Sequence, residues 1–515
     1  MFASLRTATT RKIVLDAART ARVTRVDRRG ILLPPGSSAA RQPIQSPTSG
    51  KAASVAPVPT ELLTVIEETI KVCNIVIQDL RGKADLASLS QTHGPLPVSR
   101  YMTLCLQHPT LGYYTTKKVF GSVGDFITSP EISQIFGELL AIWYVTQWAA
   151  QGAASKVRIV ELGPGRGTLL ADILRTFKAL PSHSSPPVTS IHLIESSDAM
   201  RAEQKKKLEA TGFAGVTTHW WGSVDEVPTT EDEFTIIVAH EFFDALPIHV
   251  FENTPKGWRE VMVDVSDPKS IIVSSAPKLP LRLVLSPSPT PASTMYTRMA
   301  TIASDAEAAK PSLSAALSFD TTLPPPTPTT ATAPATPEAP VSQTLSRFAR
   351  LPVGSRMEIS PACWEVARGV GKLLQGQKGG AGLVVDYGDE KAFGRSWRGF
   401  RKHQIVDPLS EPGHTDLTAN VDFSYLAEAM SDMVTSHGPL QQKDFLTSLG
   451  LQPRLEGLLR KAKDDRRGEI ESAAKRLVDK AGMGSEYKVM AITPKKEGEG
   501  ERAECFPFGT KRVGE

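Results

Sequence analysis

The chain has 515 residues, of which 40% are hydrophobic and 22% charged, a balance typical of a folded protein with one large domain or two. It has no apolar run of the roughly 18 residues that span a bilayer, and its four cysteines form no CxxC pair, so neither a zinc site nor a disulfide framework is expected. The net charge is +4, but residues 1–60 hold eight Arg and two Lys against two Asp, so the remainder is acidic and does not favour nucleic acid.

The N-terminal segment, residues 1–60, is typical of a transit peptide followed by a linker. Arginines recur through it among Ala, Thr and Val, acids are scarce, and no long apolar centre marks a secretory signal. A basic tail without a targeting role is the alternative. Residues 34–60 are rich in Pro, Ser, Gly and Ala, which is a linker composition.

Residues 61–150 are predicted to form a helical N-terminal part that packs on the α/β domain following it in the chain. Apolar residues step by three and four from Glu61 to Leu80, which predicts one amphipathic helix. A second helical run carries Tyr101 to Leu106 and ends near Pro109.

An alternation of strands and helices begins at Val157. The segments "VRIVEL", "IHLIES" and "FTIIVAH" are predicted strands, and "TLLADILRTFKAL" and "DAMRAEQKKKLEA" are predicted helices, the second with Asp198 as its N-cap. This order predicts an α/β fold with a mainly parallel sheet. The next runs, "PIHVFE" and "GWREVMVDV", are predicted to form a hairpin.

The second half of the α/β domain, which is expected over residues 151–495, contains two insertions. Residues 286–342 are rich in Pro and Thr and are predicted to be disordered. A helix "PACWEVARGVGKLL" and a strand "AGLVVDYG" follow, then a helical insertion over 415–460, a charged helix over 465–481 and a strand "YKVMAIT". Residues 496–515 are expected to be a C-terminal tail.

The segment "VELGPGRGTLL" places Gly163, Gly165 and Gly167 between a strand and a helix. A dinucleotide-binding turn has its third glycine one residue later, and a P-loop has Gly-Lys-Ser/Thr, which is absent. An acid followed by glycines at alternate positions is the pattern of class I methyltransferases that use S-adenosylmethionine. Glycines let backbone approach a ligand closely, and this cofactor has no phosphates to hold. A plain strand–helix turn and a nicotinamide site remain alternatives.

Two acids at strand ends support S-adenosylmethionine. Glu161 ends the strand before the glycines, where a carboxylate favours the sulfonium charge of the cofactor. Glu195 ends the next strand, 28 residues after Gly167, and is expected to bind the ribose hydroxyls. A nicotinamide site also uses an acid at the second strand, so Glu195 alone does not separate the two cofactors.

The chain resembles the MidA family, the mitochondrial arginine methyltransferases that assist assembly of respiratory complex I. The resemblance covers roughly residues 92–455 without the Pro/Thr-rich insertion, and its family-specific motifs are "GDFITSPEIS" and "EFFDALP". It implies a seven-stranded methyltransferase sheet, a mitochondrial matrix location, and symmetric dimethylation of an arginine in a peripheral-arm subunit of complex I. One departure is His240, where the family usually has Asn before the Glu of "EFFDALP".

Methyl transfer to arginine brings two cations together, so carboxylates are needed to offset their repulsion and to orient the guanidinium. Glu241 and Asp244 follow the strand "FTIIVAH", at the edge where open α/β sheets bind substrates. We expect Glu241 to orient the substrate, with Asp244 as the second choice, although Asp244 is equally compatible with a turn cap. His240 is a further candidate base, and a structural role is the alternative.

Two loops are further candidates for the site. In "GDFITSPEIS" the residues Gly124, Asp125 and Phe126 are expected to close over the cofactor, and a capped turn is the alternative. "HTDLTANVDF" carries His414, Asp416 and Asp422, which either face the substrate or form a solvated loop. No metal site is expected, because no second His lies at ligand spacing from His414.

Besides the nicotinamide oxidoreductase that the glycine turn leaves open, two functions of different classes remain possible on sequence. The first is a protein arginine methyltransferase with a protein substrate. The second is an assembly chaperone that binds S-adenosylmethionine and catalyses little. The oligomeric state is not predicted.

Overall fold

The computed structural model describes residues 60–80, 94–116, 128–213, 215–266, 279–298, 351–495 and 505–509. Residues 1–59 of the predicted transit peptide and linker, the segment Gly124 to Phe126, and residues 299–342 of the Pro/Thr-rich insertion lie outside this part. Within the described ranges, no helix has the length and apolar character required to cross a membrane.

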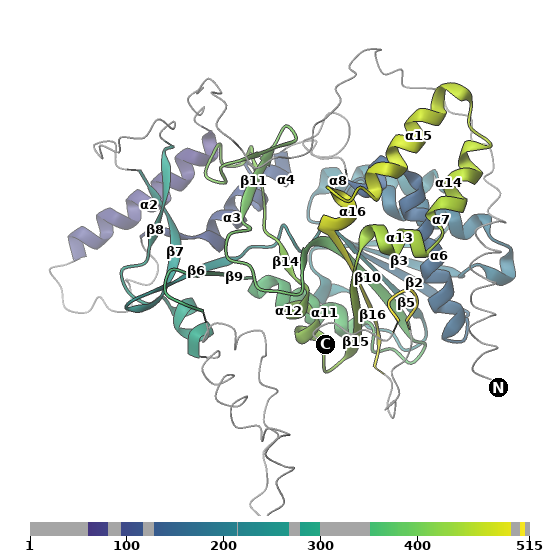
Figure 1. Cartoon of the computed structure of the whole chain (residues 1–515). Helices are drawn as coiled ribbons and strands as arrows, with labels where there is room; N and C mark the ends of the chain where they lie inside the picture. Colours follow the sequence, from purple (N-terminus) through teal and green to yellow (C-terminus); the bar gives the residue numbers. More distant parts are fainter. Residues whose placement is uncertain are drawn as a thin grey trace, which may run out of the picture.

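The predicted seven-stranded sheet is present and forms one lobe of the molecule (Figure 1). Its central strands are parallel, whereas the strand before the edge and the edge strand itself are antiparallel to their neighbours. A short strand also pairs in parallel with the end of one central strand. In spatial order the seven strands are β15 (Val434–Gln441), β16 (Tyr487–Pro494), β10 (Gly380–Asp389), β5 (Phe234–His240), β2 (Val157–Leu162), β3 (Val188–Ile194) and β4 (Thr217–Trp221), and the short strand is β14 (Val421–Asp422).

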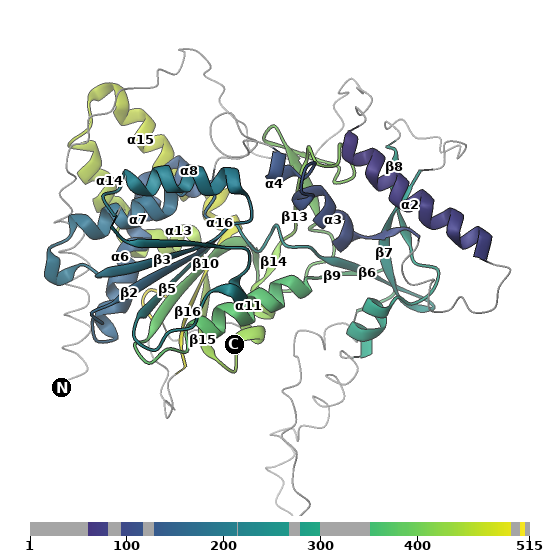
Figure 2. The ribbon, with the colours of Figure 1, turned by 180° about the vertical axis from the view of Figure 1, so that it is seen from behind.

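Helices cover both faces of this sheet, which is why the side chains of β2 and β5 are buried throughout (Figure 2). One face packs against α6 (Gln134–Ala150), α7 (Thr168–Ala179), α8 (Asp198–Glu209), α13 (Gln442–Ser448), α14 (Leu451–Leu459) and α15 (Asp464–Leu477). The other face packs against α11 (Pro361–Leu373), α12 (Phe423–Met430) and the 3-10 turn η2 (Val224–Glu226). Smaller helical turns are α5 (Ser129–Ile132), η1 (Ser182–Ser184) and α16 (Met483–Glu486).

A second, antiparallel sheet forms the other lobe (Figure 1). The predicted hairpin is present in it as two adjacent strands, β6 (His249–Thr254) and β7 (Gly257–Val265). The remaining strands are β1 (Leu96–Pro97), β8 (Leu281–Leu285) and β9 (Arg356–Ile359). Its apolar side packs against α2 (Glu61–Leu80) and α3 (Val98–Gln107).

This second sheet changes the expected position of the helical N-terminal part. The helix predicted from Glu61 to Leu80 has those bounds, but α2 and α3 pack on the second sheet, whereas α6 packs on the main sheet. The residues predicted as one helical unit are therefore divided between two cores. The reason is that the strands of the second sheet leave one face apolar, and the stripe of α2 buries it.

Three local predictions were wrong. Residues 286–298, which were expected to begin the disordered insertion, are ordered and include a helix over 291–298 in which Tyr296 is buried. The insertion over 415–460 is helical only in part, since β15 lies within it and pairs with β16 of the main sheet. Ser197, not Asp198, is the N-cap of α8, because its hydroxyl accepts a hydrogen bond from the backbone N–H of Met200. Asp198 instead begins the first turn, where its charge favours the helix dipole.

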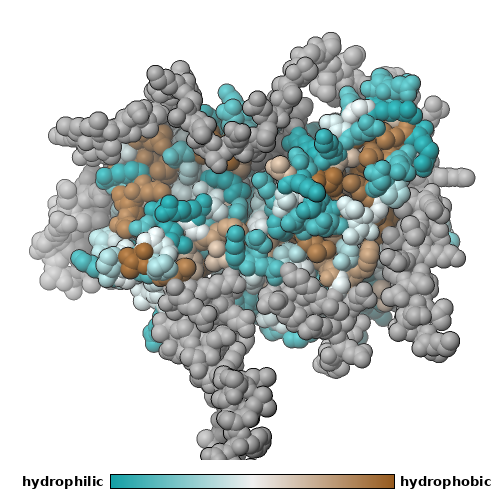
Figure 3. Space-filling view, in the orientation of Figure 1, coloured by the Kyte–Doolittle hydropathy of each residue, from teal (hydrophilic) through white to brown (hydrophobic). Residues whose placement is uncertain are grey.

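A small third sheet lies beside the second lobe and consists of β11 (Arg398–Arg401), β12 (Gln404–Val406) and β13 (Asp416–Thr418). The short helix α4 (Tyr113–Thr116) is linked to it, because the Tyr114 hydroxyl donates a hydrogen bond to Asp416. On the face seen in Figure 3, hydrophobic side chains gather in patches among hydrophilic ones over both lobes. Leu283 and Leu285 of strand β8 are among the exposed large apolar residues.

Candidate active site

The candidate site lies at the carboxyl edge of the main sheet. The strands β2, β3, β5 and β10 are parallel, so their C-terminal ends meet at this edge. Glu161 lies near the end of β2, Glu195 follows β3, Glu241 follows β5 and Asp386 lies near the end of β10. The sheet thus brings together acids that are far apart in the chain: Glu161 and Asp386 are separated by 225 positions.

The three glycines after β2 form a tight turn. Gly163, Gly165 and Gly167 have φ angles of +61°, +50° and +72°, a left-handed conformation that other residues rarely adopt. The Gly163 amide donates a hydrogen bond to the Ile194 carbonyl of β3, and Gly167 is the N-cap residue of α7. A Cβ atom on Gly163 would lie 2.8 Å from Cδ2 of Phe242, so any other residue would require the Phe242 ring or the turn to shift.

Glu161 is a buried carboxyl with an unused oxygen. Its exposed fraction is 3%, and Oε2 has no hydrogen-bond partner among the described residues. Burial raises the pKa of Glu161 to about 8, because the ionised form loses its hydration. A cation placed beside this carboxyl would favour ionisation and bind to it.

Glu195 is held in place by two donors. Its Oε1 accepts from the Ser197 amide at 2.8 Å, and its Oε2 accepts from the Gln204 side chain at 3.1 Å. The Gln204 amide also donates to the Gly165 carbonyl at 2.7 Å, so this buried side chain joins the glycine turn to Glu195. Gln204 was not predictable from the sequence, because a glutamine on a charged helix carries no pattern of its own.

These residues fit S-adenosylmethionine. The glycine turn exposes backbone, the buried Glu161 has an oxygen free for a cationic group, and each Glu195 oxygen can accept a second hydrogen bond. Glu161 and Glu195 would therefore hold the cofactor, which supplies an electrophilic methyl group when bound. The loop with Gly124, Asp125 and Phe126 lies outside the described residues, so its expected closure stays a prediction.

Glu241 stands directly after β5 in an unusual backbone conformation. Its φ is +50°, which is uncommon for a residue with a side chain and is found most often at functional sites. Oε1 accepts a hydrogen bond from the Tyr487 hydroxyl at 2.8 Å. Burial, with the nearby Asp244 charge, raises the pKa of Glu241 to about 8. None of the ion pairs that Lys or Arg forms in the described part of the chain involves Glu241.

His240 lies beside Glu241, with Nε2 3.5 Å from Oε1 of the carboxyl. Its ring is buried next to Phe136 and parallel to the ring of Tyr487. Burial lowers the pKa of His240 to about 3, so the imidazole is neutral at physiological pH and is a weak base. This favours packing over proton transfer as its role.

Asp386, which comes from β10, caps the turn after β5. Its Oδ2 accepts hydrogen bonds from the backbone amides of Phe242, Phe243 and Asp244, at 3.2, 2.9 and 3.3 Å. Asp244 is itself buried, and its pKa is raised to about 6 by burial, an effect that the charge of Arg398 opposes. The Asp244 carboxyl also accepts backbone hydrogen bonds within this turn, from Ala245 and from its own amide, so the expected capping role stays open beside the substrate role.

The loop "HTDLTANVDF" divides between structural and site roles. Asp422 is the N-cap of α12 and accepts from the amides of Ser424 and Tyr425, and His414 is exposed. Asp416 is buried and accepts from Tyr114, and its charge contributes to the raised pKa of Glu241. Of the three residues, Asp416 is therefore the one near the candidate site, and the loop is not a solvated one.

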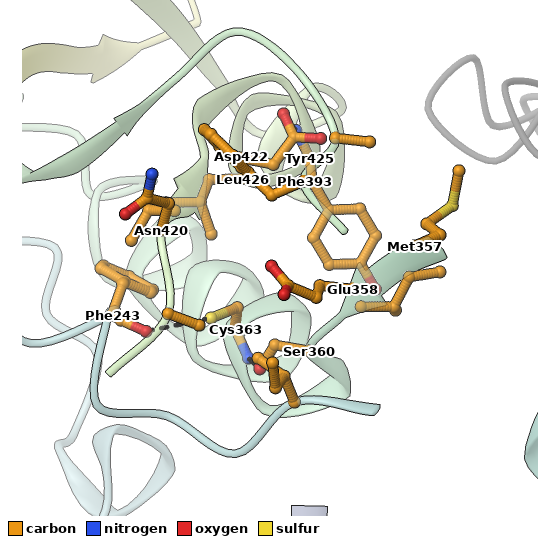
Figure 4. A pocket seen from close by; sticks show the side chains of 15 residues that line it. Phe243, Met357, Glu358, Ser360, Cys363, Phe393, Asn420, Asp422, Tyr425 and Leu426 are labelled. Atoms are coloured by element: carbon orange, nitrogen blue, oxygen red, sulfur yellow. Dashed lines mark hydrogen bonds between the residues drawn. The ribbon is translucent and has the colours of Figure 1, made fainter. Parts of the chain in front are cut away.

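A pocket lies next to this edge rather than at the glycine turn (Figure 4). Residues of β9, α11 and α12 line it, and Phe243 forms the wall shared with the turn after β5. Cys363 in this wall donates to the Phe243 carbonyl, and burial raises the pKa of its thiol to about 12, so it is not a nucleophile. Among the described residues, no group of three or more His, Cys, Asp or Glu could hold a metal ion.

The fold and the site define a class I methyltransferase that uses S-adenosylmethionine. Residues 139–440 match the family described as "Putative S-adenosyl-L-methionine-dependent methyltransferase". A Burkholderia thailandensis protein described as a "likely methyl transferase", bound to S-adenosyl-homocysteine, has the same fold, with a TM-score of 0.54 and 21% identity over 85% of this chain and 95% of its own.

The curated relatives are more specific. The zebrafish (Danio rerio) protein arginine methyltransferase NDUFAF7, mitochondrial, is 35% identical over 79% of this chain and 85% of its own length. The Homo sapiens protein of the same name is 34% identical over 79% of this chain and 82% of its own. The chain belongs to the NDUFAF7 family of protein arginine methyltransferases, which confirms the family to which the motifs pointed.

Proposed function

We propose that this chain transfers methyl groups from S-adenosylmethionine to an arginine of a protein substrate. The observation that carries this proposal is Glu241: a buried carboxyl with a raised pKa, at the edge of the sheet where the glycine turn lies. The names of the curated relatives support arginine as the acceptor. We further propose symmetric dimethylation, a peripheral-arm subunit of complex I as substrate, and the mitochondrial matrix as location.

The chemistry of arginine explains why such a site suits it. A guanidinium is cationic at any ordinary pH, so it must be brought toward the positive cofactor against repulsion. Glu241 would ionise as the guanidinium arrives and would orient it through two parallel hydrogen bonds. Asp244 lies in the same cluster and would add negative charge, although Arg398 already offsets part of it.

The roles of the two acids therefore differ. A bond forms between the guanidinium nitrogen and the methyl carbon while the bond from that carbon to sulfur breaks, and the nitrogen then loses a proton. Glu241, ionised by the pairing, can hold the guanidinium and accept that proton. Asp244 serves as the second carboxylate, and Asp386 keeps the turn that carries both in place.

The test is mass spectrometry of complex I subunits from three cell lines. One makes the wild-type chain, one lacks it, and one makes Glu241→Gln, which removes the charge but keeps the shape. Methylarginine is expected only with the wild-type chain. A fourth line makes Glu469→Gln, which changes an exposed carboxyl on α15; it is the matched control and should restore methylation.

Two results would overturn the proposal. The first is the absence of any methylarginine that depends on the chain, and the second is full methylation by Glu241→Gln. If complex I assembles normally with Glu241→Gln while methylarginine is lost, the contribution of the chain to assembly is that of a cofactor-binding chaperone.

A further inference from the structure

Two tyrosines from neighbouring strands meet beside Glu241. Tyr387 on β10 and Tyr487 on β16 are direct partners in the antiparallel register. Their ring centroids are 4.1 Å apart, and their hydroxyl oxygens are 2.6 Å apart. The Tyr487 hydroxyl is also 2.8 Å from Oε1 of Glu241. Glu241, at the end of β5, therefore lies beside the hydroxyls of two tyrosines from β10 and β16, the next two strands of the sheet.

The hydrogen bonds have a direction. A tyrosine hydroxyl has one hydrogen, and an ionised carboxylate can only accept. Tyr487 must therefore donate to Glu241 once this group is ionised, which leaves Tyr387 to donate to Tyr487. Both rings are largely buried, so the chain from Tyr387 through Tyr487 to Glu241 lies away from bulk water. Hydrogen bonds of this kind are stronger when buried and when the acceptor is charged.

A glutamate side chain needs donors to hold its carboxyl in one orientation. It has three rotatable bonds, and fixing it in one arrangement costs rotamer entropy. The left-handed backbone at Glu241 and the Asp386 cap fix only the main chain of the turn. In the described part of the chain, Tyr487 is a side chain that donates a short hydrogen bond to the Glu241 carboxyl, and the backbone of Ser129 is a second donor to it.

We propose that Tyr487, itself fixed by Tyr387, is a positioning residue that aims the ionised Glu241 carboxylate at the substrate guanidinium. This inference rests on the proposed function, because it needs Glu241 to be the group that binds the arginine. Tyr487 acts through Glu241 and does not contact the reacting atoms. A second consequence follows for the charge of the carboxyl: the Tyr487 hydrogen bond lowers the pKa of Glu241 against the rise that burial causes.

The test is Tyr487→Phe, which removes the hydroxyl and keeps the buried ring. Methyl transfer is measured from radiolabelled S-adenosylmethionine to the peripheral arm of complex I isolated from cells that lack the chain. We expect kcat to fall about tenfold or more, since a hydrogen bond to a charged group is lost. Affinity for S-adenosyl-homocysteine should be unchanged. The acid limb of the pH profile should move to higher pH, because the ionised carboxylate loses a donor.

Two further variants complete the test. Tyr387→Phe removes the donor to Tyr487 and should shift the profile in the same direction by a smaller amount, and it replaces Tyr487→Phe if that variant does not fold. Tyr101→Phe is the matched control: its buried hydroxyl donates to the Pro408 carbonyl in the second lobe. This control should leave kcat and the pH profile unchanged.

The inference can fail while the proposed function stands. If Glu241→Gln abolishes transfer but Tyr487→Phe leaves both kcat and the pH profile unchanged, Tyr487 does not position the carboxyl. If Glu241→Gln transfers methyl groups normally, the proposed role of Glu241 fails instead.

Discussion

Replacing Gly163 by alanine tests whether the glycine turn serves the cofactor. The turn holds Gly163 at φ +61° and Gly167 at φ +72°, and a side chain in this conformation costs about 1–2 kcal/mol. Both Gly163→Ala and Gly167→Ala carry this cost. The two variants differ, however, in what the added Cβ atom contacts. At Gly163 the Cβ would lie 2.8 Å from Cδ2 of Phe242, whereas at Gly167 the nearest atom belongs to Gln204 and is 3.7 Å away.

Gly167→Ala is therefore a control for backbone strain alone. In Gly163→Ala the Phe242 ring or the turn must also shift, and Phe242 adjoins Glu241. We expect S-adenosyl-homocysteine to bind Gly163→Ala at least about tenfold more weakly than Gly167→Ala, a difference of about 1.4 kcal/mol. Isothermal titration gives the affinities, and denaturant unfolding gives the stabilities. Equal affinities for the two variants would refute the reasoning and leave the glycines as a plain turn.

Three further predictions follow from the buried acids. Because the pKa of Glu241 is about 8 and its ionised form is needed, kcat/KM should rise with pH up to about pH 8 and should fall about tenfold per pH unit below it; a flat profile would contradict this. The affinity ratio of S-adenosylmethionine to S-adenosyl-homocysteine should grow from pH 6 to pH 9 in the wild type, because ionised Glu161 favours the sulfonium, and should stay constant in Glu161→Gln. Asp386→Ala should lower the free energy of unfolding by about 1–3 kcal/mol in chemical denaturation, since three amides lose their acceptor; an unchanged midpoint would exclude the cap.

The main sheet was largely predictable, because its strands carry local signals. The strands Val157–Leu162 and Phe234–His240 have the predicted bounds: each is a short apolar run with polar or glycine residues at its ends. Strand β15 was missed because Gly438 and Pro439 interrupt it, and these residues ordinarily indicate a loop. The strand tolerates them because its pairing with β16 shifts register between His437 and Leu440.

The candidate site was predictable only in part, for a related reason. Glu161, Glu195 and Glu241 stand at strand ends, a position that the chain order reveals. The partners that hold these acids come from far away in the sequence: Tyr487 is 246 residues from Glu241. Such contacts depend on strand order and register, which no local pattern encodes.

Burial of these acids explains how one site can bind two cations. Glu161 and Glu241 each have a pKa of about 8 because they are buried, so both are largely neutral at pH 7 until a cation arrives. In the proposed mechanism, each cation that enters ionises the acid beside it, and the new negative charge offsets the repulsion between cofactor and guanidinium. A permanently ionised acid at either position would carry the cost of a buried, unpaired charge in the protein without a ligand. Their raised pKa values therefore keep Glu161 and Glu241 neutral in the protein without a ligand, and the carboxylate charges form when the cations bind.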